Sequence, residues 1–202
     1  MRIELEILLL LVAYFFGSVP FGYLYVKKLT GKDIREMGSG NIGSTNVRRI
    51  AGRKAAIMTQ LADMLKGLLP VGVIWYIQFQ HIYTFDQFFI YLLALACILG
   101  HNFSIFLKFN GGKGVNTTLG ASILLSPVSV FVSVFVYYLV KWRSKYVSLG
   151  SICLALSLPI VDLFIHPVSF LFYYLLICSV LILIRHIPNI KRLIDGTESK
   201  AN

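Results

Sequence analysis

The chain has 202 residues, of which 57% are hydrophobic and only 14% are charged. A soluble domain of this size could not bury so much apolar surface, so the composition excludes an ordinary water-soluble protein and predicts an integral membrane protein. The net charge of +10 would suggest a nucleic-acid partner in a soluble protein, but we expect none here, because cation-rich inner loops account for it.

Seven apolar runs follow one another along the chain and predict an all-α, polytopic fold with seven transmembrane helices. The runs cover 3–25, 55–79, 88–107, 115–127, 128–141, 147–165 and 168–185. A straight span needs about 20 residues, so run 115–127 is too short to cross alone and suggests a half-span beside a polar cavity. The first run has no cationic leader, because Arg2 is followed by acidic residues, and we interpret it as a span and not as a cleaved signal.

The positions of the cations predict the orientation. Of the 19 Lys and Arg residues, all but Arg2 and Lys66 fall on one side when the runs alternate across a membrane, and the loops of the other side contain none. Because cytoplasmic loops are enriched in Lys and Arg, we expect the N-terminus outside and the C-terminus inside. The longest inner loop, 26–54, is too short for a separate domain. Residues 1–202 are therefore expected to form a single transmembrane domain, to whose site loop 26–54 and the polar tail 186–202 contribute.

Loop 36–49 combines glycines, short polar side chains and two arginines. Its glycines let backbone N–H groups approach a ligand closely. The short polar donors are Ser39, Asn41, Ser44, Thr45 and Asn46. Arg48 and Arg49 follow, and each can bind two phosphate oxygens. The loop thus predicts an anion site, although an ordinary capped turn also favours glycine, serine and asparagine.

A second polar stretch starts at His101 and leads into the glycines of 111–114. A glycine loop that opens an apolar helix places N–H groups and the positive end of the helix dipole at the membrane surface, and Lys113 adds a full charge. It is not a Walker A loop, because Gly114 stands where Ser or Thr would hold magnesium. We therefore expect phosphate binding without ATP, with a plain polar turn as the alternative. His101 belongs to this site or simply anchors the helix end.

Two further pieces lie near the inner ends of the last two runs. Ser148 and Ser151 share a helix face, where they either bind a phosphate or hydrogen-bond to carbonyls within the bundle. His186 and Asn189 follow the last run and could close the site from the tail, and Pro188 is expected to mark the end of the helix.

Asp63 and Lys66 lie three residues apart within the second run. An intramembrane pair of opposite charges is a functional candidate by default. We favour the alternative of a structural pair that neutralises itself and holds the glycine loops in place.

In combination and order, these motifs resemble the PlsY family, the bacterial acyl-phosphate:glycerol-3-phosphate acyltransferases. The resemblance covers nearly the whole chain, through segments 17–23, 38–46, 100–109, 111–115, 186–192 and 196–198. Ser44 and Asn116, where the family more often has alanine, are mild departures. The resemblance implies seven helices in the bacterial cell membrane, an outer N-terminus and an active site that faces the cytoplasm.

The resemblance also implies an activity without cofactor or metal. It is the transfer of a fatty acyl group from acyl phosphate to the sn-1 hydroxyl of glycerol 3-phosphate, which gives lysophosphatidic acid for phospholipid biosynthesis. By position in the motifs, the expected site residues are Ser39, Asn41, Thr45, Arg49, Gly111, Gly112, Lys113, Gly114, Ser151, His186, Asn189 and Glu198. Among them Ser39, Lys113 and His186 are the candidate catalytic residues, and the N–H groups of 111–114 could polarise the acyl carbonyl.

Two readings of the proton transfer stay open. Either His186 acts as a general base, or the phosphate of the donor takes the proton and His186 only hydrogen-bonds to substrate. We favour the second, because no inner carboxylate is obviously paired with His186. His81 and Asp86 match the His-x4-Asp spacing of other glycerolipid acyltransferases, but they lie in an outer loop, and we interpret the match as a coincidence.

The main alternative function is a membrane transporter or binding protein for an organophosphate anion. Such a transporter should show inverted repeats, and no repeat is visible in the sequence. A CDP-alcohol phosphotransferase would need several aspartates for metal, whereas the chain has nine acidic residues in total. The basic inner face is also a candidate docking surface for a soluble acyl-phosphate synthase.

Overall fold

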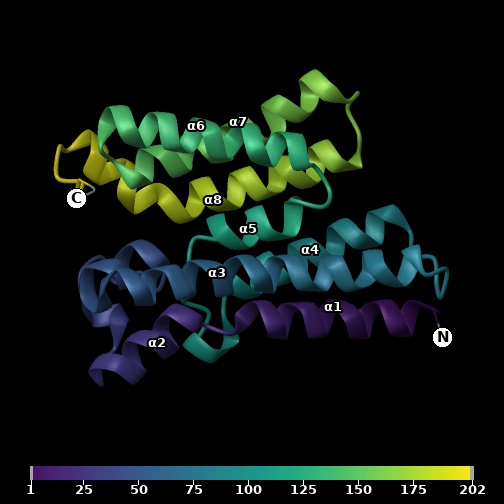
Figure 1. The fold of residues 1–202 in the computed structure, drawn as a ribbon, viewed down its shortest axis with the longest axis horizontal. Helices are drawn as coiled ribbons and strands as arrows, with labels where there is room; N and C mark the ends of the chain where they lie inside the picture. The colour runs from purple at the N-terminus through teal and green to yellow at the C-terminus, as the bar shows by residue number, and fades with distance from the viewer. Residues whose placement is uncertain (1, 201–202) are drawn as a thin grey trace. The chain divides into compact units, whose positions relative to one another are not determined.

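The computed structural model describes residues 2–200, and this part of the chain folds into α-helices and short 3-10 helices, which confirms the predicted all-α class (Figure 1). The chain divides into two compact units, the first ending at Leu124 and the second beginning at Leu125.

Unit 1 contains α1 (Arg2–Ser18), α2 (Phe21–Thr30), η1 (Ile34–Glu36), α3 (Ser44–Phe79), α4 (Gln87–Asn102), η2 (Ile105–Leu107) and α5 (Val115–Ser122). Within it, α4 packs against α1, α3 and α5, and α3 also packs against α2 and α5. Unit 2 contains α6 (Pro127–Ser144), α7 (Val147–Ile165) and α8 (Phe170–Ile194). Here α7 packs against both α6 and α8 (Figure 1).

Within residues 2–200, five helical stretches are long and apolar enough to cross a membrane. They are Arg2–Thr30, Ser44–Phe79, Gln87–Leu107, Val147–Ile165 and Phe170–Ile194. The eight residues of α5 are too few to cross a membrane alone, as run 115–127 predicts. The basic last turn of α6, with Lys141 and Arg143, lowers its hydropathy. Seven spans therefore stay a prediction, five of which have the required length and composition.

The predicted run 3–25 is not one continuous helix, because α1 and α2 are separated at Val19 and Pro20. Proline has no N–H group and disfavours helical geometry in the residue before it. The carbonyl groups released at the break find side-chain donors instead: Ser104 Oγ donates to Ser18 O at 2.6 Å and Lys66 Nζ donates to Val19 O at 3.0 Å. An interrupted helix inside a bilayer needs such partners, since no water is available there.

Helix α3 begins at Ser44, well before the predicted start of its apolar run at residue 55. The second half of loop 36–49 is therefore helical, and its prediction as a loop is wrong. The cause is Gly43, whose extended backbone starts the helix, so that the polar stretch forms its first turns. The helix then kinks at Gly52, which has φ 84° and ψ −179°. This left-handed conformation favours glycine, and it separates the segment 44–51 from the apolar part of α3.

The prediction that Pro188 ends the last helix is also wrong, because α8 continues to Ile194. A proline inside a helix removes one backbone hydrogen bond. The helix tolerates this loss because His186, Asn189 and several apolar side chains on the same element are buried. The consequence is that His186 and Asn189 sit on a rigid helix and not in a flexible tail.

Helices α3 and α5 touch backbone to backbone. A Cβ atom on Gly67 would overlap the carbonyl oxygen of Thr117, and one on Gly120 would overlap that of Met64. Small residues permit this close approach of helices in a membrane. The contact fixes α5, and with it the glycine loop that precedes α5, against α3.

Candidate active site

The glycine loop 111–114 opens helix α5, as predicted from the sequence. Gly114 is the residue before the helix and has φ 83°, in the left-handed region. The loop is anchored to the end of α4, where Gly111 N–H donates to Asn102 O at 3.2 Å and Gly112 N–H donates to His101 O at 2.9 Å. Lys113 is partly exposed between buried glycines. A lysine beside a helix N-terminus is an arrangement suited to an anion.

These anchors correct one expectation about the loop. The N–H groups of Gly111 and Gly112 serve carbonyls of α4, so they do not point at a substrate carbonyl. The first N–H groups of a helix have no partner within it, and α5 starts directly after Gly114. The donors for an oxyanion are therefore expected at the first turn of α5.

The side chain of Asn102 lies beneath this loop. Asn102 is fully buried, and a Cβ atom on Gly114 would fall against its amide oxygen. Among the described residues, neither its Oδ1 nor its Nδ2 has a hydrogen-bond partner. A buried unpaired amide costs free energy. Such a group is common where a site is built for a polar ligand, and sequence analysis gave Asn102 no role.

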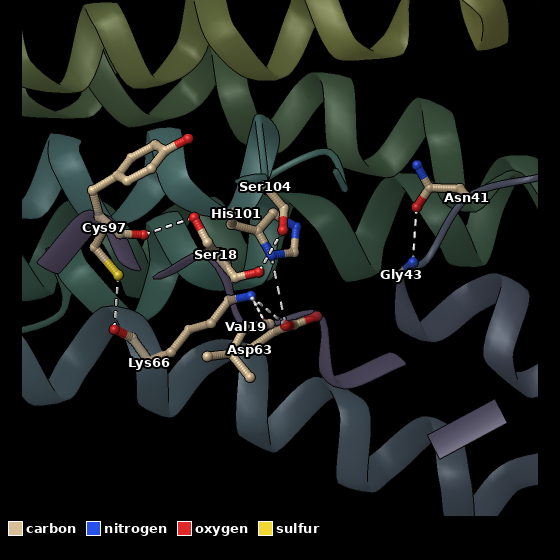
Figure 2. A network of polar contacts seen from close by, with 10 residues as sticks. Ser18, Val19, Asn41, Gly43, Asp63, Lys66, Cys97, His101 and Ser104 are labelled. Atoms are coloured by element: carbon tan, nitrogen blue, oxygen red, sulfur yellow. Dashed lines mark hydrogen bonds and ion pairs between the residues drawn. The ribbon is translucent and has the colours of Figure 1, made fainter. Parts of the chain in front are cut away.

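A buried charge network, drawn in Figure 2, includes His101, whose imidazole lies against Gly112 of the loop. Lys66 Nζ is 3.0 Å from Asp63 Oδ1, and His101 Nδ1 is 3.6 Å from the same oxygen. All three side chains are at most 5% exposed. The predicted pairing of Asp63 with Lys66 is confirmed. Sequence analysis did not foresee that Lys66 also donates to Val19 O, although Pro20 within an apolar run signals a broken helix.

Loop 36–43 is organised by the side chain of Asn46. Its Oδ1 accepts from Ser39 N at 3.0 Å, and its Nδ2 donates to Met37 O at 3.0 Å and to Asn41 O at 2.9 Å. The side chain of Asn41 accepts from Gly43 N at 2.8 Å. Both asparagines therefore shape the loop. Sequence analysis placed Asn41 in the site and named Asn46 only as a donor.

The other predicted residues of this stretch are more exposed. Ser39, Thr45 and Arg49 are all exposed. Thr45 and Arg49 are four residues apart at the start of α3, so they share one helix face. Arg49 can therefore reach a phosphate without losing a structural contact.

One hydrophobic cluster connects two of the four predicted stretches. Its buried members are Val26, Ile34, Ile42, Val47, Ala55, Ala56 and Leu107. Ile42 and Val47 belong to the stretch 36–49, and Leu107 belongs to η2, four residues before the glycine loop. Within unit 1, the loop 36–43 and the segment that leads to the glycine loop thus share a core.

Unit 2 contains the remaining predicted residues. His186 is 2% and Asn189 5% exposed, and both lie on α8. His186 Nδ1 lies 2.8 Å from Ile182 O, so a neutral imidazole donates there and presents Nε2 as an acceptor. Ser151 Oγ donates to Val147 O at 3.0 Å, which is the bundle contact considered above as its alternative role. That the stretches of both units form one site stays a prediction.

Glu198 ties the tail back to α8. Asn189 Nδ2 donates to Glu198 Oε1 and Arg192 Nε donates to Glu198 Oε2, each at 2.7 Å. Burial opposes ionisation of this carboxyl, but the hydrogen bonds from Asn189 and Arg192 outweigh burial and lower the pKa of Glu198 below its ordinary value. The tail is therefore held by an ionised glutamate.

This pKa shift predicts a pH dependence. A carboxyl with a lowered pKa stabilises the fold fully above its unfolded pKa, about 4.3 for Glu, and the contribution disappears as the pH falls through the folded value. We expect Glu198→Gln to increase hydrogen exchange in the tail at pH 7, and the difference from wild type to vanish at acidic pH. Asp195→Asn, at an exposed carboxylate, is the control. A difference that persists in acid would contradict the assignment.

The outer-loop match has a structural explanation. Asp86 precedes α4 and its Oδ1 accepts from Phe88 N at 2.7 Å, which caps the helix. Aspartate is a preferred residue at this position. His81 lies in the turn after α3. The capping contact accounts for the aspartate of the His-x4-Asp spacing.

Comparison with known proteins adds independent information. A family model described as glycerol-3-phosphate acyltransferase matches residues 7–196. The chain is 41% identical over 194 residues to the glycerol-3-phosphate acyltransferase of Clostridium acetobutylicum, covering 95% of this chain and 98% of that one. It is 46% identical over 191 residues to that of Trichlorobacter lovleyi, covering 93% of each.

Two solved structures are also similar, both of PlsY, an integral membrane glycerol 3-phosphate acyltransferase. The glycerol 3-phosphate form is 34% identical with a TM-score of 0.88, covering 98% of this chain and 96% of that one. The lysophosphatidic acid form is 33% identical with a TM-score of 0.84, covering 96% and 94%. The predicted resemblance is confirmed, and with it an integral membrane protein. By sequence along nearly its whole length and by fold, this chain belongs to the glycerol-3-phosphate acyltransferase family.

Proposed function

We propose that this protein transfers a fatty acyl group from acyl phosphate to the sn-1 hydroxyl of glycerol 3-phosphate, which yields lysophosphatidic acid for phospholipid biosynthesis. The observation that supports this best is the likeness over nearly the full length to PlsY in its glycerol 3-phosphate and lysophosphatidic acid forms. The lysine and glycine loop at the start of α5 supplies the phosphate-binding chemistry that these substrates require.

Each predicted site residue has a proposed role. Arg49 and Lys113 neutralise substrate phosphates, because Arg49 is an exposed cation in the first turns of α3 and Lys113 is a partly exposed cation in the glycine loop. The other residues proposed around glycerol 3-phosphate are Ser39, Ser151, His186 and Asn189. Those proposed to shape or support the site are Asn41, Thr45, Gly111, Gly112, Gly114 and Glu198.

The reaction is a single acyl transfer. The hydroxyl oxygen of glycerol 3-phosphate attacks the acyl carbon and forms the ester bond, while the bond from that carbon to the phosphate oxygen breaks. The electron pair leaves with the phosphate, which also takes the hydroxyl proton. Acyl phosphate is already activated, so orientation of two anionic substrates is the main task, and orientation can supply about 7–11 kcal/mol.

Replacement of His186 tests which group takes the proton of the attacking hydroxyl. Its Nδ1 lies 2.8 Å from the backbone carbonyl oxygen of Ile182, a contact that fixes the orientation of the ring for a hydrogen bond to substrate. We expect His186→Ala to raise KM for glycerol 3-phosphate about tenfold with a smaller effect on kcat, as for a lost substrate hydrogen bond. His81→Asn, in the outer loop, should leave both constants unchanged. A fall in kcat of about 10²–10⁴-fold with intact substrate binding would instead make His186 a general base.

A comparison of donors tests the activity itself. The purified protein is supplied with glycerol 3-phosphate and, in parallel, with acyl phosphate, acyl-CoA or acyl carrier protein loaded with the same chain. We expect lysophosphatidic acid with acyl phosphate only. Product from acyl-CoA, or uptake of glycerol 3-phosphate into sealed vesicles without acylation, would overturn the proposal.

We also propose seven membrane segments, formed by α1, α3, α4, α5, α6, α7 and α8, in the bacterial cell membrane. The cation distribution supports an outer N-terminus and a cytoplasmic active site. Single cysteines introduced at Ser39, Lys108 and Lys191 should react with a membrane-impermeant reagent from the cytoplasmic side only. Reaction of any one of them from the outside would overturn this topology.

A further inference from the structure

We propose that Asp63, Lys66 and His101 form a buried support that positions Gly112, and that this support sets the affinity of the glycine loop for the phosphate of glycerol 3-phosphate. The proposal rests on the proposed function for the identity of that ligand. It makes these three side chains positioning residues, which act through the loop and do not touch substrate.

His101 contacts the glycine loop directly. The main chain of His101 accepts a hydrogen bond from Gly112 N–H at 2.9 Å, and its imidazole lies so close to Gly112 that a Cβ atom would overlap Nε2. The neighbouring Asn102 accepts from Gly111 N–H at 3.2 Å and lies against Gly114. The loop thus rests on the last residues of α4 at three of its four positions.

The charges of Asp63 and Lys66 also indicate a positioning role for His101. Lys66 and Asp63 are 3.0 Å apart and almost fully buried, so they already neutralise each other. A self-neutralising pair needs no third ionisable group, yet His101 Nδ1 lies 3.6 Å from Asp63 Oδ1 (Figure 2), and its imidazole also lies against Gly112. A buried ion pair is also often no more stabilising than apolar residues of similar volume. Stability alone therefore does not account for the trio, whereas fixing the imidazole does.

Lys66 also anchors the trio to neighbouring parts of the fold. Lys66 Nζ donates to Val19 O at the break between α1 and α2, and Cys97 Sγ donates to Lys66 O at 2.8 Å. The pair is thus attached to α1, α3 and α4. A support attached to three helices holds Gly112, and with it Lys113 and the start of α5, in place, and a binding site has to be kept within about 0.5 Å of its productive geometry.

A double-mutant cycle between His101 and Gly112 tests the contact. Binding of glycerol 3-phosphate to the purified full-length protein is measured by calorimetry for His101→Ala, Gly112→Ala and the double variant. We expect each single change to raise Kd about tenfold. The double variant should be less impaired than the product of the two, because the new methyl group enters the space that the imidazole leaves. Defects that simply multiply would overturn the proposal.

A neutral version of the ion pair separates positioning from stability. Asp63→Asn/Lys66→Gln removes both charges and leaves no unpaired ion. We expect a folded protein with Tm close to wild type but a Kd for glycerol 3-phosphate raised about tenfold. The matched control is Asp162→Asn/His166→Gln in unit 2, where a buried carboxylate and an imidazole are 3.0 Å apart. That control should bind like wild type.

The outcomes are distinct. A folded neutral variant that binds within about twofold of wild type would show that the pair is only structural and would overturn the proposal. If that variant does not fold, the His101 and Gly112 cycle decides alone, since it leaves the pair intact. A wild-type protein that binds glycerol 3-phosphate but does not acylate it would refute the proposed function and leave this binding test valid.

Discussion

Replacing Lys113 with alanine is expected to lower kcat/KM for glycerol 3-phosphate by about a hundredfold. A hydrogen bond to a charged group contributes about 1.5–3 kcal/mol, and a hundredfold loss corresponds to about 2.7 kcal/mol, within that range. Lys113 is the only cation in the glycine loop 111–114, and it lies two residues before the start of α5 at Val115. The measurement is steady-state acyl transfer over a range of glycerol 3-phosphate concentrations.

Lys113→Arg and Lys108→Asn complete that experiment. Arginine keeps the charge but not the compact ammonium, so part of the activity should return. Lys108 is exposed and has φ 52°, a conformation that asparagine tolerates. Its replacement removes one cation from the same polar segment between α4 and α5. Equal losses in the Lys108 and Lys113 variants would mean that general basicity, and not the loop, attracts the substrate.

Gly120→Ala is expected to cause the largest loss of stability. The added methyl group would overlap the backbone carbonyl of Met64 on α3, and backbone cannot move aside as a flexible side chain can. Overpacking of this kind costs about 1–3 kcal/mol, which corresponds to a fall in Tm of about 2–12 °C for a chain of this size. Activity should fall as well, because α5 carries the glycine loop.

Gly72→Ala on α3 is the matched control for that prediction. There the nearest atom to a new Cβ is Leu124 Cδ1 at 3.7 Å, an ordinary contact, and alanine favours a helix. We expect an unchanged or slightly higher Tm, measured in the same detergent. A Gly120→Ala protein as stable as Gly72→Ala would show that α3 and α5 do not depend on backbone contact.

The existence of the helices was predictable because apolar runs bounded by polar turns have few other solutions in a bilayer. The start of α5 at the glycine loop was equally readable, since glycine followed by an apolar run marks a helix start. The first and last residues of the helices were harder to predict. Polar residues such as Thr45 and Arg49 do not look like part of a long helix until Gly43 is seen to start it.

What sequence analysis could not supply is contact between residues far apart in the chain. Nothing near Lys66 in sequence indicates that its ammonium group bonds to Val19, 47 residues away. Asn46 illustrates the same limit at short range. Its side-chain amide accepts one hydrogen bond and donates two, and all three depend on how loop 36–43 folds back. Pro188 misled the prediction because the local rule against proline is weaker than the packing of a whole helix face.

The interruption at Val19 and Pro20 also bears on biogenesis. A newly made α3 carries a carboxylate and an ammonium in its apolar part, and an isolated helix would insert with difficulty in that form. The ammonium group finds its second partner only in the open turn that follows α1. We therefore expect α1 and α3 to enter the lipid together and not one after the other.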